Sequence, residues 1–188
     1  MQKFKHIKMK KINFSDKFCL TQAVLDGLKT MTRRIVPQSV IDKYSMMEDF
    51  TIIDDAKYNT DEVIAVAQSY KDCINDILIA QRYKTDIVTL AFMRSKGWNN
   101  KMFVCSKQMP HHIRITDVKV EKLQDISDID CLAEGINYYE QKGFSWCSTG
   151  KIFDTPRDAF ASLIDKISGK LTFQSNPWVF VYEFELVD

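Results

Sequence analysis

Residues 27–34 read Gly27-Leu28-Lys29-Thr30-Met31-Thr32-Arg33-Arg34. This segment follows an apolar helical pattern over 17–26 and ends shortly before Pro37. Gly27 stands where a left-handed glycine ends a helix, so we expect the chain to turn there into an extended segment. Alternate residues of an extended segment share a face, which puts Thr32 and Arg34 on one side and Lys29 and Arg33 on the other. Residue types alone leave open a solvated basic turn and a functional site.

Composition places the chain among ordinary globular proteins. Its 188 residues, 45% hydrophobic and 27% charged, suffice for one domain with a proper core. A net charge of +1 excludes binding of duplex nucleic acid by overall charge alone, although a local basic pocket stays open. No apolar run is long enough for a membrane helix, and the lysine-rich start of the chain lacks the apolar core of a secretory signal.

Cysteine and histidine usage argues against a metal centre. The five cysteines are scattered and odd in number, without a Cys-x-x-Cys pair, and the three histidines lack ligand spacing. Neither a zinc site nor a disulfide framework is indicated, and reduced thiols are the simpler interpretation. We therefore expect a cytoplasmic protein that uses no metal and no cofactor and has no membrane partner.

Hydrophobic periodicity gives an alternating series of short elements. Strands are expected over 11–15, 29–34, 50–53, 62–68, 102–104, 112–123 and 178–187, helices over 17–26, 71–96, 128–134 and 156–168, and a loop or hairpin over 137–150. The apolar alternation breaks between Ile115 and Val118, which predicts a β-bulge. Strands and helices without regular βαβ alternation indicate an α+β fold, best met by a small mixed barrel with helices packed outside.

Four blocks of sequence, in order, resemble the ASCH domain, a branch of the PUA-like β-barrels, and in particular its phage and mobile-element members. The blocks are Phe14-Ser15 with the following helix and residues 27–34, which resemble a Gly-x-Lys-Thr-x-Thr-x-Arg signature; residues 62–66; Met109-Pro110 with 114–135; and residues 176–179. The resemblance implies a single PUA-like domain over 1–188 in which 71–100 is a helical insertion.

The resemblance also implies a function. The family is similar to RNA-binding PUA domains, so we expect the cleft beside the signature to bind RNA, single-stranded nucleic acid or a modified nucleoside. One group of small bacterial members hydrolyses the amide of acetylated cytidine with a lysine, a threonine and a glutamate, which fall on Lys29, Thr32 and Glu134. Thr32 is then the nucleophile, Lys29 the base that activates it, and Glu134 orients the lysine or carries the proton.

Further residues are expected to hold the substrate. They are Thr30, Arg33, Arg34, Gln68, Tyr70 and Arg114. Trp98 and Trp146 are open as base-stacking residues, whereas Trp178 is expected in the core.

Structural alternatives remain for the same residues. Lys29 and Glu134 can form an ion pair that fastens the loop, Thr32 can be a simple strand residue, and Arg34 can clamp a helix end. A different class of function makes the chain an interaction protein with 71–96 as a dimer face, and the sequence leaves the oligomeric state open. A straight strand would separate Lys29 from Thr32, so the enzyme hypothesis requires a kink at Thr30-Met31.

Overall fold

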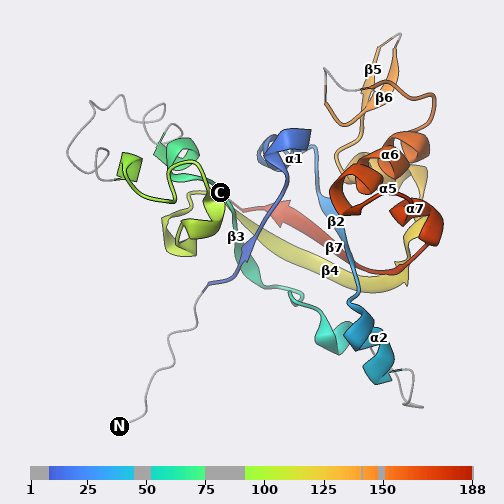
Figure 1. The fold of residues 1–188 in the computed structure, drawn as a ribbon, viewed down its shortest axis with the longest axis horizontal. Helices are drawn as coiled ribbons and strands as arrows, with labels where there is room; N and C mark the ends of the chain where they lie inside the picture. The colour runs from blue at the N-terminus through green and yellow to red at the C-terminus, as the bar shows by residue number, and fades with distance from the viewer. Residues whose placement is uncertain (1–8, 45–51, 75–91, 141, 148–150, 188) are drawn as a thin grey trace. The chain divides into compact units, whose positions relative to one another are not determined.

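The computed structural model describes residues 9–44, 52–74, 92–140, 142–147 and 151–187 (Figure 1). The chain forms two compact units, one of residues 1–14, 63–113 and 187–188 and a larger one of residues 15–62 and 114–186. The prediction that the whole chain is one domain stays a prediction.

The main sheet contains five strands in the order β1-β3-β4-β7-β2. Their bounds are β1 Lys11–Ile12, β2 Met31–Ile35, β3 Val63–Val66, β4 His112–Lys122 and β7 Trp178–Leu186. The sheet is mixed, because β1 is parallel to β3 whereas β2 is antiparallel to β7. With the helices of both units, this confirms the α+β class. No pairing within the described residues joins β1 to β2, so the sheet is open there and the predicted barrel closure is not confirmed.

The smaller unit is built on β3. The strand expected over 62–68 is confirmed as β3, and its residues Ile64, Ala65 and Val66 are each 0% exposed, so it is buried on both faces. Ala65 and Ala67 pack with Val104 and Met109 in a small apolar core. The Lys11 ammonium fastens the segment after residue 100 by donating to the carbonyl oxygens of residues 101, 102 and 104 at 2.8–3.0 Å.

Two short 3₁₀ helices complete this unit, η3 Lys101–Phe103 and η4 Ser106–Gln108. The predicted strand over 102–104 is therefore wrong. Asn100 accepts a hydrogen bond from the Met102 amide and so caps η3. Residues 70–74 and 92–93 are helical, but most of the helix predicted over 71–96, and with it the proposed dimer face, lies outside the described residues.

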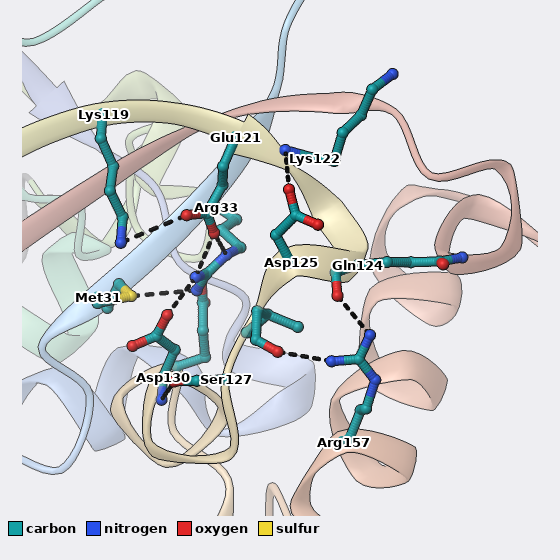
Figure 2. Close-up of polar contacts among 12 residues, drawn as sticks. Met31, Arg33, Lys119, Glu121, Lys122, Gln124, Asp125, Ser127, Asp130 and Arg157 are labelled. Carbon is teal, nitrogen blue, oxygen red and sulfur yellow. Dashed lines mark hydrogen bonds and ion pairs between the residues drawn. The ribbon is translucent and has the colours of Figure 1, made fainter.

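The larger unit carries helices on the β2–β7–β4 portion of the sheet. Its described helices are η1 Asp16–Phe18, α1 Leu20–Leu25, α2 Gln38–Tyr44, η2 Ile52–Asp55, η5 Leu123–Asp125, α5 Asp128–Ala133, α6 Pro156–Ser168 and α7 Thr172–Ser175. In Figure 1, α6 packs beside α5 and α7. The Arg157 guanidinium on α6 donates to the carbonyl oxygens of Gln124 and Ile126, which fixes the segment that leads into α5 (Figure 2).

Local hydrogen bonds shape the helix ends and a hairpin of this unit. Ser127 and Thr155 cap α5 and α6 by accepting hydrogen bonds from backbone amides three residues on. The hairpin expected within 137–150 is confirmed, and it consists of β5 Asn137–Tyr139 and β6 Gly143–Ser145. Exposure of both Thr116 and Asp117 breaks the burial pattern of β4 at the predicted position, while the bulge itself stays a prediction.

Three expectations for the larger unit are wrong. Residues 52–53 belong to a 3₁₀ helix rather than a strand, and residues 50–51 lie outside the described part. The helix over 17–26 is divided at Cys19, whose φ of 59° is left-handed, into η1 and α1. Trp178 is 37% exposed with the Lys122 ammonium 4.4 Å from its ring centroid, whereas Trp146 is buried.

Candidate functional site

The Lys29 turn begins with the end of α1. The Leu28 amide donates to the Ala23 carbonyl at 2.8 Å and the Gly27 amide to Val24 at 3.0 Å, which is the hydrogen-bond pattern of a Schellman motif. Gly27 has the φ of +70° that this motif requires of its left-handed residue. The Lys29 amide also donates to Ala23, at 2.9 Å. The predicted glycine stop is confirmed, and it fixes where the Lys29 side chain starts.

The Lys29 side chain is buried, with 2% of its surface exposed. Its ammonium donates to the Met31 carbonyl at 2.7 Å, to the Glu134 carbonyl at 2.7 Å and to Glu134 Oε2 at 2.6 Å. An ammonium has three N–H bonds, so these acceptors use all of them. Lys29 and Glu134, 105 residues apart in sequence, therefore form a buried ion pair, and their part in catalysis stays a prediction.

Glu134 is placed by the C-terminal end of α5. It is the residue at which the helix ends, and Gly135 follows with a φ of +95°, which turns the chain away. The Thr30 amide donates to the Ala133 carbonyl at 2.9 Å, so the two segments are also joined through their backbones. A C-terminal helix end favours a nearby cation, and the Lys29 ammonium supplies one.

Burial shifts the titration of Lys29. It lowers the pKa of Lys29 below its ordinary value of 10.5, because the charged form loses its hydration, while the Glu134 carboxylate opposes that effect without cancelling it. The nearby charges of Arg34 and Arg33 lower the pKa further. The neutral form of the Lys29 amine therefore lies closer in free energy to the charged form in this site than it does in water.

Arg33 connects Glu134 to two more carboxylates. Its Nη1 donates to Glu134 Oε1 at 3.3 Å, its Nε and Nη2 donate to Glu121 Oε1 at 3.0 and 2.6 Å, and its Nη2 donates to Asp130 Oδ2 at 2.8 Å. Figure 2 shows the guanidinium between Glu121 of β4 and Asp130 of α5, with the Met31 sulfur beside it. The Arg33 side chain is 1% exposed, so this contact holds a strand to a helix through a buried guanidinium.

The charges of the cluster balance. Lys119 lies 3.4 Å from Glu121 Oε2, so Lys29, Arg33 and Lys119 stand against Glu121, Asp130 and Glu134. Burial alone would raise the pKa of Asp130, but the hydrogen bond and charge of Arg33 outweigh it and hold that pKa below 3.8. Burial would likewise lower the pKa of Arg33, but Glu134, Glu121 and Asp130 raise it. We call these six residues the Arg33 cluster.

Thr32 lies on the opposite face of β2. It pairs with Tyr182 while Arg33 pairs with Val181, so alternation directs Thr32 away from the Arg33 cluster. Thr32 is 4% exposed, and within the described residues its hydroxyl makes no hydrogen bond to Lys29 or Glu134. The strand begins at Met31, so Lys29 precedes it in the turn and the alternation does not extend to Lys29.

The other predicted substrate residues are distributed more widely. Thr30 is exposed next to Lys29, and Arg34 is half-buried on the Thr32 face. Arg114 is on the solvent side of β4, 3.4 Å from the Glu185 carboxylate. Gln68 and Tyr70 belong to the smaller unit, where Gln68 is buried and the Tyr70 hydroxyl donates to Gln108.

The sequence did not identify Glu121, Asp130 or Lys119 as members of the site. Asp130 stands in the first turn of α5, where an acid is favourable in any helix, and its carboxylate binds Arg33. Glu121 lies 88 residues from Arg33, and nothing local marks that pairing. The one usable signal was an arginine within a strand that is buried at Met31 and Thr32, because a buried guanidinium requires carboxylate partners.

Two general features of the described residues bear on the chemistry. None of their His, Cys, Asp and Glu side chains forms a group of three suited to holding a metal ion. No helix among them has the length and apolarity that crossing a bilayer demands.

Two solved structures are among those to which the chain is similar. The chain is similar to the ASCH domain from Lactobacillus crispatus JV V101, with a TM-score of 0.41 and 11% identity over 97% of this chain and 81% of that one. It is also similar to a protein from Enterococcus faecalis V583 of the family model DUF984, with a TM-score of 0.43 and 16% identity over 96% and 81% of the two chains. No protein-family model and no curated protein matches the sequence.

Proposed function

We propose that the chain binds a nucleoside unit of RNA or of another single-stranded nucleic acid at the Lys29–Arg34 segment. The observation that carries the proposal is the buried Lys29–Glu134 pair directly beside the exposed Thr30. Burying charged groups costs free energy, and clusters with perturbed pKa values are concentrated at functional sites. Arg34 is half-buried on the Thr32 face of β2, and the planar fork of a guanidinium has the geometry that matches a phosphate or a base edge.

Binding of this kind is expected to be weak and moderately sensitive to salt, because the net charge is only +1. Fluorescence anisotropy with short single-stranded RNAs between about 50 and 200 mM salt measures the affinity and its dependence on salt. We expect Arg34→Gln to weaken binding about five- to tenfold and to reduce the salt slope by about one. The matched control is Lys170→Gln, which removes one exposed cation between α6 and α7. Equal affinities of the two variants would count against this site.

A second candidate function is hydrolysis of an acylated nucleoside amide, and the 2.6 Å Lys29–Glu134 contact favours it. In this reaction Lys29 first passes a proton to Glu134. The start of β2 then has to turn, because the Thr32 hydroxyl lies on the opposite face of the strand and must reach Lys29 to give up its proton as it attacks the acyl carbon. The carbon–nitrogen bond breaks as the leaving amine receives a proton from the Lys29–Glu134 pair. Water then releases the acyl group from Thr32.

Turnover is tested by incubating the protein with a panel of N-acylated nucleosides, including acetylated cytidine, and separating the products. We expect Thr32→Val and Lys29→Ala to lower the rate at least about 100-fold, because one removes the nucleophile and the other its base. Thr116→Val, an exposed threonine of β4, is the matched control and should retain the rate. Absence of turnover on every substrate would leave binding as the function.

A further inference from the structure

Two cysteines from distant parts of the sequence lie in contact in the larger unit. The Sγ atoms of Cys19 and Cys147 are 2.7 Å apart, although the residues are separated by 128 positions. Cys19 precedes α1, and Cys147 follows β6. Both side chains are half-buried, in contrast to Cys73 and Cys131, which are buried. A small reagent can therefore reach the pair, and neither partner needs to cross the unit to meet the other.

We propose that Cys19 and Cys147 are a site of oxidative modification and form an intramolecular disulfide when a small disulfide such as glutathione disulfide oxidises them. A disulfide bond is about 2.05 Å long. Closing the gap from 2.7 Å therefore takes a movement of about 0.65 Å. Cys19 lies between η1 and α1, and its backbone has a left-handed φ of 59°. Its side chain therefore projects from a helix boundary and not from the middle of a helix.

The reaction is a pair of thiol–disulfide exchanges. One protein thiolate attacks a sulfur of glutathione disulfide, forms a mixed disulfide and releases one glutathione thiolate. The second protein thiolate attacks the protein sulfur of that mixed disulfide, forms the Cys19–Cys147 bond and releases the second glutathione. Two electrons pass from the protein to glutathione disulfide, and the two thiol protons end on the two glutathione molecules.

The bond would join the two segments that carry the buried ion pair. Cys19 immediately precedes α1, which leads through Gly27 to Lys29, and Cys147 follows the β5–β6 hairpin, which comes after Glu134 and Gly135 in the chain. A cross-link between residues so far apart in sequence restricts the unfolded chain strongly. We therefore expect the oxidised protein to unfold at higher denaturant concentration than the reduced protein.

Reaction with glutathione disulfide is expected to be slow at neutral pH. The hydrogen bond with Cys147, together with burial, raises the pKa of Cys19 to about 11. Only the thiolate attacks a disulfide, so incubation over hours is required.

The experiment follows individual tryptic peptides of the native chain. Trypsin releases Cys19 in residues 18–29, Cys147 in residues 143–151 and the exposed Cys105 in residues 102–107, each with a single cysteine. The protein is equilibrated across ratios of reduced to oxidised glutathione, free thiols are alkylated, and peptides are analysed without reduction. We expect a linked pair of 18–29 with 143–151, lighter than the separate peptides by two hydrogen atoms. Cys105 is expected to carry only glutathione.

Variants make the result independent of peptide recovery. Cys147→Ser should abolish the linked peptide and the upward shift of the urea midpoint on oxidation, while Cys105→Ser should retain both. The proposal is overturned if pure glutathione disulfide leaves Cys19 and Cys147 alkylated, or converts each to a separate mixed disulfide. A link between either cysteine and Cys105 would overturn it equally.

Discussion

Replacing Glu134 with glutamine is expected to lower the free energy of unfolding by about 3–5 kcal/mol at neutral pH, the range found when one partner of a buried ion pair is removed. The Glu134 carboxylate accepts from Lys29 through Oε2 and from Arg33 through Oε1. A glutamine offers one oxygen and one NH₂ group, so one of the two cations would face N–H donors. Urea unfolding followed by circular dichroism measures the change.

The matched control for this substitution is Glu185→Gln. Glu185 also pairs with an arginine, Arg114, but the two side chains are 56% and 47% exposed. Exposed pairs contribute less than about 1 kcal/mol, so this variant should stay close to the native protein. Adding Lys29→Met to Glu134→Gln should restore part of the lost stability, because it removes the buried positive charge that the carboxylate no longer neutralises. Similar losses for Glu134→Gln and Glu185→Gln would show that burial of Glu134 is not what matters.

The pH dependence of this loss has a definite sign. Because the pKa of Lys29 is lowered below 10.5 in the folded protein, the unfolded chain holds more protons between the two values, and stability rises with pH across that window. Removing the Glu134 charge removes an interaction that raises the pKa, so the window begins at lower pH. The deficit of Glu134→Gln should therefore shrink as unfolding is measured from about pH 6 to about pH 9. A deficit that grows with pH would contradict the assignment of a buried, charged Lys29.

Features governed by neighbouring residues could be predicted from the sequence. Gly27 ends α1 because a left-handed residue is needed within two positions of the last helical amide, and Ser127 and Thr155 cap helices through amides three residues away. β7 and β4 were predicted because their periodic apolar residues must be buried. The strand predicted over 102–104 failed because a short apolar run has the same pattern in a strand and in a single helical turn.

The candidate site likewise has contacts that could be predicted from the sequence and contacts that could not. The pairing of Lys29 with Glu134 was available only through a resemblance, since the two residues are 105 positions apart and no periodicity relates them. The partners of Arg33 and the contact of Cys19 with Cys147 depend on packing between distant segments and left no local signal. Arg33 was predicted to hold substrate, whereas its donors are engaged by carboxylates of the protein itself.

Replacing Arg33 with methionine is expected to lower the free energy of unfolding by about 3–5 kcal/mol at neutral pH, as for Glu134→Gln. In this variant the buried charge that is removed is the positive one. Methionine fills much of the same volume but leaves Glu121, Asp130 and Glu134 without their shared cation. Arg33→Lys keeps the charge, but a single ammonium cannot reproduce a planar fork that spans carboxylates of β4 and α5. We expect the lysine variant to fall between methionine and the native protein. Arg114→Met, which breaks the exposed pair with Glu185, is the control and should cost less than about 1 kcal/mol.

Acid titration separates loss of charge from loss of packing in Arg33→Met. In the native protein the pKa of Asp130 is depressed below 3.8, so its contribution is present above the unfolded pKa and is lost as pH falls through the folded value. Without Arg33, burial raises the pKa of Asp130, and protonation of that carboxylate then relieves repulsion within the cluster. The stability difference between native and variant protein should therefore narrow as pH falls toward about 4. If the difference stays constant from neutral pH to that point, the guanidinium contributes through packing alone, and the Arg33 cluster is not an electrostatic unit.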